Sequence, residues 1–410
     1  MTTHTPHYLR AYEELAYGLF LHWGLYSQIE SGEWVRNYRR IPKEKYAELA
    51  NTFTAEKFNA KGLVQWAKRA GFRYICLTTR HHDGFSLYDT RGLNDFDAPH
   101  SAAGRDLVAE YAEACHAEGM AMFFYHTTLD WLEESFETDF PAYLEYLRKS
   151  VEILCTQYGK VAGLWFDGNW ARPEADWEED RLYSLIRKHQ PECVIVNNSS
   201  TKARGKIGHP EVDVVTFEQG TPVRVESTGR YLATEMCETI NSHWGTAAFD
   251  FSHKSPATII ETLAACRGSG ANLLLNIGPD ASGALPAYEK AALEFVGRWI
   301  ETCGQSIYRG RPSNLTCRGR DFVLQDGEAS YYFAHNISIT GNTHLHTGES
   351  GIGLATVQGR LPRISRVSWV DNGESLPFIQ DQENGMFTFD STPFPYGRQM
   401  VVRVAKLIPA

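Results

Sequence analysis

Short apolar runs alternate with longer amphipathic stretches through the first three quarters of the chain. The runs are continuously apolar, which is typical of strands buried on both faces of a parallel sheet. We therefore expect eight strands, at residues 18–24, 74–79, 121–126, 163–167, 193–197, 212–218, 231–236 and 271–278. The amphipathic stretches between them predict helices, most clearly at residues 61–70, 106–118, 141–158, 176–189 and 256–267.

Eight buried strands with interleaved helices predict the architecture of residues 1–310, which is an α/β fold of the (β/α)8-like barrel type. The connection at residues 219–230, between the sixth and seventh strands, has no helical pattern. We therefore expect a barrel with irregular or missing helices on that side.

The pattern changes after the last predicted barrel helix, at residues 286–303. The apolar segments become short and alternate with polar positions, and turn sequences such as Asp326-Gly and Asp371-Asn-Gly separate them. Segments of this kind lie at residues 330–334, 344–346, 367–370, 386–389 and 400–404. Residues 311–410 are therefore predicted to form a C-terminal antiparallel β-sandwich.

The composition narrows the classes of partner. The chain has 410 residues, of which 43% are hydrophobic and 22% are charged, as in ordinary globular proteins. Its net charge of −10 argues against binding nucleic acid or an anionic membrane surface, because both need a basic face. No apolar stretch reaches the roughly eighteen residues of a membrane span. The N-terminal segment lacks a basic start followed by an apolar run, so we expect a cytoplasmic protein.

Polar residues gather at the carboxyl ends of six of the eight predicted strands. In a barrel these ends form one rim, and that rim carries the active site. The strand-end residues are His22 and Trp23, then His81, His82 and Asp83, then Tyr125 and His126, Asp167, Asn197 and Asn198, and Glu218. The repetition of this pattern indicates an enzyme.

Two of these residues are carboxylates that follow buried strands. Asp167 ends a buried aromatic strand, where a charge is costly unless it is used or paired. Glu218 ends the second predicted strand after the one that Asp167 ends. Two carboxylates facing each other over a pocket lined by Trp and His suit glycoside cleavage, in which one attacks and the other donates a proton. The alternative is that both carboxylates only cap or pair.

A metal site is a second reading of the same rim. His22, His81, His82 and Asp167 could together hold the metal of a hydrolase. Against this, the first strand has no His-X-His pair, and neighbouring side chains at 81 and 82 would point to opposite sides of an extended backbone. None of the eight cysteines forms a Cys-X-X-Cys pair. Phosphate-binding glycine loops and a Gly-X-Ser-X-Gly elbow are also missing from the sequence.

Four motifs in this order carry a family resemblance: Tyr17-Gly-Leu-Phe-Leu-His-Trp-Gly-Leu-Tyr-Ser, Gly32-Glu-Trp, Leu77-Thr-Thr-Arg-His-His-Asp-Gly-Phe and Leu164-Trp-Phe-Asp-Gly. The set resembles the α-L-fucosidases of glycoside hydrolase family 29 over residues 10–310. The resemblance implies a barrel followed by a β-sandwich. It also implies hydrolysis with retention through a covalent fucosyl-enzyme, with no metal or organic cofactor.

The resemblance also implies roles for individual residues. Asp167 matches the nucleophile of the Leu-Trp-Phe-Asp-Gly motif. The residues implied to bind the fucosyl group are His22, Glu33, Trp34, His81, His82, Tyr125, Trp165 and Trp244. A fucosylated glycan or small fucoside is the implied substrate, and the sequence leaves a homo-oligomer open.

The acid/base is the least defined position, because it varies between branches of the family. Glu218 in Asp213-Val-Val-Thr-Phe-Glu-Gln matches a family segment that resembles Gly-Asp-Phe-X-Thr-Pro-Glu-Gln. Glu211 and Glu235 compete with it, and Arg204 is a candidate for the arginine that follows the fifth strand. A retaining glycosidase for a related sugar and a metal-dependent hydrolase are the rival functions.

Overall fold

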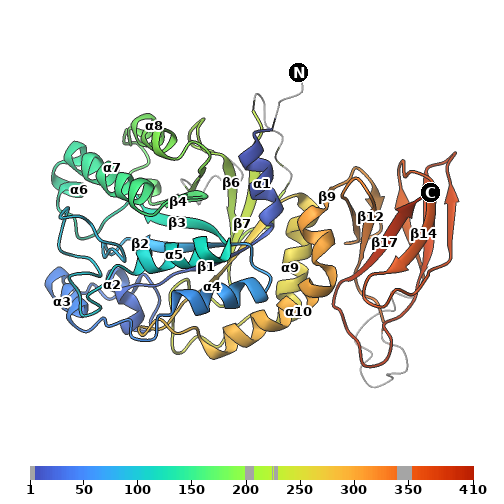
Figure 1. Cartoon of the computed structure of the whole chain (residues 1–410), viewed down its shortest axis with the longest axis horizontal. Helices are drawn as coiled ribbons and strands as arrows, with labels where there is room; N and C mark the ends of the chain where they lie inside the picture. Colours follow the sequence, from blue (N-terminus) through green and yellow to red (C-terminus); the bar gives the residue numbers. More distant parts are fainter. Residues whose placement is uncertain (1–4, 199–206, 224, 226–229, 339–352) are drawn as a thin grey trace. The chain divides into compact units, whose positions relative to one another are not determined.

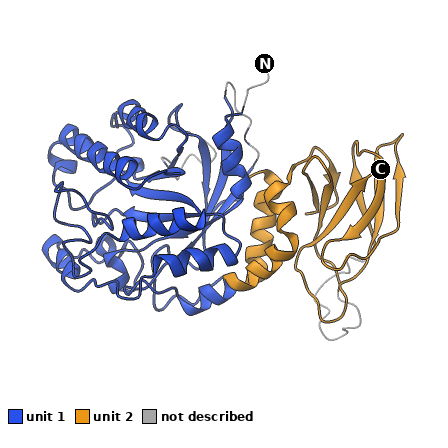
Figure 2. Cartoon of the chain, viewed as in Figure 1, with its two compact units in different colours: residues 1–254, 272–292 blue, residues 255–271, 293–410 orange. Residues whose placement is uncertain are grey.

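The computed structural model describes residues 5–198, 207–223, 225, 230–338 and 353–410. It divides into two compact units, one of residues 1–254 and 272–292, the other of residues 255–271 and 293–410 (Figure 2). Helix α9 (Pro256–Ser269) and most of helix α10 (Ala287–Arg309) therefore group with the C-terminal sheets. The predicted domain boundary after residue 310 stays a prediction.

The first unit contains a closed parallel barrel, as the sequence predicted (Figure 1). Each strand pairs with the next one along the chain, and β8 pairs with β1. The strands are β1 (Tyr17–Leu21), β2 (Tyr74–Arg80), β3 (Ala121–Thr127), β4 (Gly163–Asp167), β5 (Val194–Asn198), β6 (Val214–Glu218), β7 (Ala233–Thr239) and β8 (Asn272–Ile277). Because the strands are parallel, their carboxyl ends share one rim.

Helices connect most of the strands, and local signals set their ends. The N-cap side chain of Asp106 accepts a hydrogen bond from the Ala109 amide, and Gly119 ends that helix with a φ of 65°. The helices of this unit are α1 (His7–Leu15), α2 (Val35–Tyr38), α3 (Lys43–Ala47), α4 (Ala60–Arg69), α5 (Leu107–Glu118), α6 (Ser135–Thr138), α7 (Phe140–Gln157) and α8 (Glu179–His189). In the described part of the β5–β6 and β6–β7 connections the chain forms no helix. None of the described helices is long and apolar enough to cross a membrane.

Large side chains fill the barrel interior, and glycines make room for them. A Cβ on Gly163 would lie 1.9 Å from the Phe123 ring, and a Cβ on Gly18 would lie 2.2 Å from the Tyr74 ring. Helix α1 adds Tyr12 to the same buried cluster. The interior is thus a packed core rather than a channel, so a substrate can reach only the ends of the strands.

The second unit holds two antiparallel sheets. One has the order β10-β13-β16-β15 and the other β14-β17-β12-β11-β9. The strands are β9 (Arg311–Pro312), β10 (Thr316–Cys317), β11 (Phe322–Gln325), β12 (Ser330–Ala334), β13 (Gly353–Gln358), β14 (Ile364–Trp369), β15 (Phe378–Asp381), β16 (Met386–Ser391) and β17 (Arg403–Pro409). The predicted strand at 344–346 lies outside the described residues.

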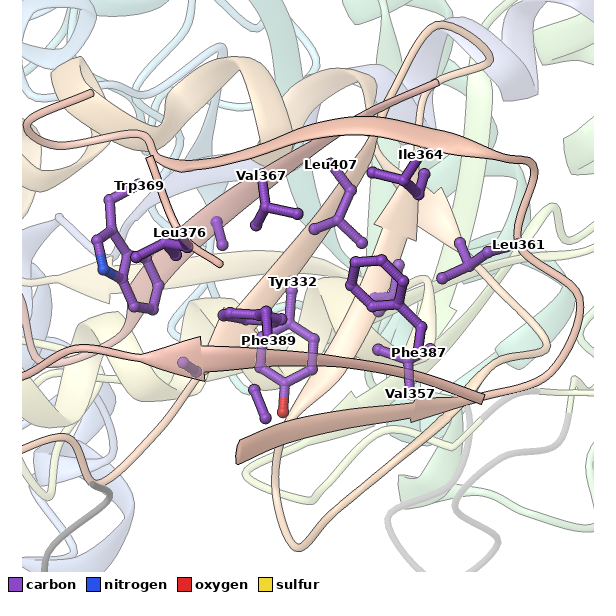
Figure 3. Close-up of a cluster of buried hydrophobic side chains, with 14 of the residues drawn as sticks. Tyr332, Val357, Leu361, Ile364, Val367, Trp369, Leu376, Phe387, Phe389 and Leu407 are labelled. Carbon is purple, nitrogen blue, oxygen red and sulfur yellow. The ribbon is translucent and has the colours of Figure 1, made fainter. Parts of the chain in front are cut away.

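A shared core joins these two sheets face to face. Val357 and Phe387 of one sheet pack in the same buried cluster as Tyr332, Val367 and Leu407 of the other (Figure 3). The predicted antiparallel β-sandwich is confirmed by this arrangement.

A buried arginine stabilises one end of the sandwich. The fully buried guanidinium of Arg403 donates to the Asp371 carboxylate at 2.9 Å and to the carbonyls of Thr392 and Pro393 at 3.1 and 3.0 Å. Its central carbon also lies 4.3 Å from the centre of the Trp369 ring. Removing this cation leaves the Asp371 charge buried, which costs more than losing a surface ion pair.

We therefore expect Arg403→Met to lower the free energy of unfolding of the sandwich by about 3–5 kcal/mol. Arg398→Ala is the matched control, because Arg398 also contacts Asp371, at 3.7 Å, but is half exposed. That control should cost less than about 1 kcal/mol. Urea unfolding monitored by tryptophan fluorescence measures both, and equal losses would contradict the assignment.

Candidate active site

The barrel rim brings together most of the residues singled out in the sequence. Asp167 and Glu218 are the last residues of β4 and β6. His22 follows β1 directly, and His81 and His82 follow β2. These side chains come from four strands and meet only because the barrel closes.

Three side chains surround the Asp167 carboxylate, which is 16% exposed. The Trp170 indole N–H donates to Oδ1 at 2.9 Å, and the Tyr125 hydroxyl donates to Oδ2 at 3.4 Å. Nε2 of His82 lies 3.4 Å from the same Oδ2. The carboxylate is therefore oriented from both of its oxygens while still reaching solvent.

The backbone around Asp167 is held as firmly as its side chain. The Thr128 amide donates to the Asp167 carbonyl at 2.7 Å, and the Thr128 hydroxyl donates to it at 3.1 Å. Gly168 then turns the chain with a φ of 127°, and a Cβ there would lie 2.6 Å from the Leu129 nitrogen. Only glycine fits this abrupt turn, which lets Trp170 fold back onto the carboxylate.

Glu218 lies two strands from Asp167, and Asn198 connects them. Asn198 pairs with Asp167 in the β4–β5 register, and its amide donates to Oε2 of Glu218 at 2.8 Å. Burial raises the pKa of Tyr125 well above its usual value, and the charges of Asp167 and Glu218 raise it further. The charges of both carboxylates therefore raise the pKa of the same phenol, that of Tyr125.

The two other acid/base candidates lie elsewhere. Glu211 precedes β6 at its amino end, where its carboxylate accepts a hydrogen bond from Arg187 of α8 at 3.2 Å. Glu235 is inside the barrel, where its carboxylate accepts hydrogen bonds from three side chains: Tyr12 at 2.5 Å, Tyr74 at 3.0 Å and Trp165 at 2.9 Å. Burial raises its pKa. Of the three glutamates, only Glu218 ends a strand at the rim.

His22 is held as a neutral hydrogen-bonding group. The Asn276 amide nitrogen donates to the Trp244 carbonyl at 2.7 Å, so its oxygen must accept from Nδ1 of His22, at 2.6 Å. Nε2 of His22 then carries a lone pair that can accept a hydroxyl hydrogen. Burial lowers the pKa of His22 to about 3, which keeps the ring uncharged.

His81 and His82 both belong to the site, because the backbone is not extended there. Strand β2 ends at Arg80 and the chain turns, so the alternation expected of a strand does not apply. The two rings lie 4.2 Å apart. The Thr127 hydroxyl donates to the Leu129 carbonyl and accepts from Nδ1 of His82, at 2.7 Å, which directs Nε2 toward Asp167.

The His81 ring is stacked on Tyr125 and is almost fully buried. Its Nδ1 has no hydrogen-bond partner among the described residues. Burial and the neighbouring histidines hold its pKa well below the usual value. Buried polar atoms without a hydrogen-bond partner are rare in folded proteins, so this nitrogen is an unusual feature of the rim.

Indole rings form one wall of the site. Trp34 stacks on Trp170 at 5.7 Å and meets Trp131 edge-on at 5.0 Å. Both Trp131 and Trp170 contact the His82 ring. The sequence pattern did not point to these two residues, although Trp170 follows Asp167 by three positions, where a turn after a strand can direct a side chain back to the rim.

Glu33, Trp244 and Trp165 have structural contacts that the sequence did not indicate. Oε2 of the buried Glu33 accepts from the backbone amides of Trp244 and Gly245, at 3.1 and 2.8 Å. The Trp244 ring lies 5.1 Å from His22. The Trp165 ring stacks on Tyr125, but its N–H donates to Glu235 inside the barrel. Arg204 lies outside the described residues.

Metal coordination was the alternative use of this rim. Within residues 5–198, 207–223, 225, 230–338 and 353–410, no three His, Cys, Asp or Glu side chains are placed to hold a metal ion. The arrangement that is present combines two carboxylates with histidine rings and indole faces. Those groups can attack an acetal carbon, move a proton and bind sugar hydroxyls.

Comparison with known proteins identifies the family. A sequence profile described as Alpha-L-fucosidase matches residues 3–305. The tissue alpha-L-fucosidase of Rattus norvegicus is 24% identical over 435 residues, which cover 97% of this chain and 90% of the rat protein. Among solved structures, alpha-L-fucosidase isoenzyme 1 from Paenibacillus thiaminolyticus is 31% identical, with a TM-score of 0.84 and 98% of each chain covered.

A second solved structure is an alpha-L-fucosidase of glycoside hydrolase family 29 from Bacteroides thetaiotaomicron, described as a trapped covalent intermediate in complex with 2-fluoro-fucosyl fluoride. It is 20% identical, with a TM-score of 0.82, and the match covers 99% of this chain and 96% of that chain. The family profile spans most of the chain, and the Paenibacillus enzyme matches nearly all of it. This chain therefore belongs to the alpha-L-fucosidase family, glycoside hydrolase family 29, and is a glycoside hydrolase of that type.

Proposed function

We propose that the enzyme removes terminal α-L-fucosyl groups from fucosylated glycans or small fucosides by double displacement. Asp167 is the nucleophile and Glu218 is the general acid/base. The observation that carries this proposal is the placement of two carboxylates at the ends of β4 and β6, with Asn198 of β5 between them. The covalent intermediate of the Bacteroides relative supports a mechanism through a fucosyl-enzyme.

In the first step, a carboxylate oxygen of Asp167 attacks the anomeric carbon. The bond from that carbon to the glycosidic oxygen breaks, and Glu218 gives its proton to the departing oxygen. Hydrogen bonds from Trp170 and Tyr125 orient the attacking carboxylate. The leaving group departs as an alcohol, and the sugar stays as an ester on Asp167.

In the second step, Glu218 takes a proton from water as the water oxygen attacks the anomeric carbon. The ester bond to Asp167 breaks, and fucose leaves with its original anomeric configuration. Glu218 ends protonated and Asp167 ends ionised, so the site is ready for another cycle.

The surrounding groups suit a 6-deoxy sugar. The lone pair on Nε2 of His22 accepts a sugar hydroxyl, and His81 provides the buried Nδ1 that lacks a partner among the described residues. Indole faces such as Trp34 pack against the apolar side of the sugar. Because these groups border Asp167 on several sides, we propose that only a terminal fucosyl group is bound there.

The nucleophile is tested by Asp167→Ala. Wild-type enzyme should release 4-nitrophenol from the α-L-fucoside and much less from the β-D-galactoside. The variant should lose at least about 10³-fold in kcat, because the covalent step is gone. Added azide should restore turnover and give a fucosyl azide of the opposite anomeric configuration, which NMR identifies. Normal activity in the variant would sink the assignment.

The acid/base is tested by Glu218→Ala. A poor leaving group needs protonation, so kcat/KM for a methyl or glycan fucoside should fall by about 10²–10⁴-fold. Fucosyl fluoride, whose leaving group needs little protonation, should lose far less in the first step. Glu211→Ala is the matched control and should change neither substrate. If both substrates lose equally in Glu218→Ala, another residue is the acid.

The neutral state of His22 predicts a pH dependence of stability. Its folded pKa of about 3 lies below the roughly 6.5 of an unfolded histidine, so the unfolded chain binds the extra proton first. The contribution of His22 to the free energy of unfolding is therefore complete above pH ~6.5. As the pH falls from ~6.5 toward the folded pKa, this contribution decreases by about 1.4 kcal/mol per pH unit. In His22→Gln this slope should be smaller by about that amount, whereas the exposed His7→Gln should leave it unchanged. Denaturant titrations at several pH values measure the slopes; identical slopes would contradict a neutral His22.

A further inference from the structure

Glu235 is a buried carboxyl group that neither chemical step uses. It belongs to β7, is 1% exposed and lies inside the barrel. Its three partners are neutral donors: the hydroxyls of Tyr12 and Tyr74 and the indole N–H of Trp165. Desolvating a carboxyl group is costly, and burial accordingly raises its pKa. Apolar side chains at these four positions would fill the same space without that cost, so packing alone does not explain the group.

The two oxygens of Glu235 bind different parts of the barrel. Oε2 accepts from Tyr12 of α1 at 2.5 Å and from Tyr74 of β2 at 3.0 Å. Oε1 accepts from Trp165 of β4 at 2.9 Å. An indole N–H can only donate, and a buried donor faces its acceptor because an unmade hydrogen bond is costly. Oε1 of Glu235 therefore fixes the direction in which the edge of the Trp165 ring points.

Trp165 connects Glu235 to Tyr125 of β3. The Trp165 and Tyr125 rings stack at 5.5 Å, with 23° between their planes. Tyr125 also stacks on His81, at 5.6 Å and 15°. The Tyr125 hydroxyl donates to Oδ2 of Asp167 at 3.4 Å. Because Tyr125 packs against both rings, a rotation of the Trp165 ring would displace the hydroxyl that orients Asp167, and small displacements of a reacting group lower its rate strongly.

We propose that Glu235 is a positioning residue for the reaction, which acts from the barrel interior through Trp165 and Tyr125 to orient Asp167. The inference rests on the proposed function, because it needs Asp167 to be the nucleophile. Glu235 acts on the geometry of the attack, so its loss should lower the rate constant of the covalent step more than it weakens sugar binding.

The test measures the attack by Asp167 alone, with 2-fluoro-fucosyl fluoride as the probe. An Asp167 oxygen bonds to the anomeric carbon, the carbon–fluorine bond at that carbon breaks, fluoride leaves, and the sugar stays as an ester. Intact-protein mass spectrometry follows ester formation at several probe concentrations, which gives a maximal rate constant and a half-saturating concentration. Peptide mapping identifies the labelled residue.

Three variants separate the Trp165 contact from the rest of the Glu235 network. Glu235→Met removes the indole acceptor, so the maximal rate constant should fall about tenfold or more while the half-saturating concentration changes less than about threefold. Glu235→Gln keeps one acceptor oxygen for the Trp165 N–H, so at least about a third of the rate constant should remain. Tyr12→Phe is the matched control: it removes a hydrogen bond to the same carboxyl group but leaves the Trp165 contact, so the rate constant should be unchanged.

A further variant keeps the test independent of whether Glu235→Met folds. Trp165→Phe retains an aromatic ring in the stack but removes the N–H, and it should lower the rate constant as Glu235→Met does. Circular dichroism at the assay temperature shows which variants are folded. An unchanged rate constant in Trp165→Phe or in folded Glu235→Met, or an equal fall in Tyr12→Phe, would overturn the positioning role and leave the proposed function intact. Wild-type enzyme that is labelled on a residue other than Asp167, or not at all, would overturn the proposed function, and this inference with it.

Discussion

Closure of the parallel barrel depends on filling a narrow interior with side chains from alternate strands. Here the filling consists largely of aromatic rings, and glycines on neighbouring strands give them space, as Gly163 does for Phe123. A polar group inside such a core must be fully hydrogen-bonded, and Glu235 is, through Tyr12, Tyr74 and Trp165. The packed interior gives the rim a rigid base.

Asp167, the proposed nucleophile, rests on this interior through a short series of contacts. Glu235 accepts from Trp165, the Trp165 ring stacks on Tyr125, and the Tyr125 hydroxyl donates to Asp167. A reacting carboxylate has to keep one orientation through both chemical steps, and preorganised donors do this without rearrangement. Asn198 connects the same rim to the second carboxylate, Glu218.

The sequence predicts the structure correctly where the physical signal is local. Continuous apolar runs predicted the eight strands, because a strand covered on both faces needs apolar residues throughout. The sequence was less informative about the direction in which individual side chains point. The turn after Arg80 puts both His81 and His82 at the site, and the Trp165 N–H bonds inside the barrel rather than at the rim. Both depend on neighbours that are far away in the chain.

The sequence by itself determined the barrel, the β-sandwich and the fucosidase family, because periodicity and ordered motifs are properties of the chain. Only the tertiary structure decided which glutamate stands at the rim with Asp167. Glu211, Glu218 and Glu235 lie close in sequence, yet one is at the amino end of a strand, one at the rim and one in the barrel interior. Strand register and barrel closure make that difference, and both arise from contacts between strands rather than within them.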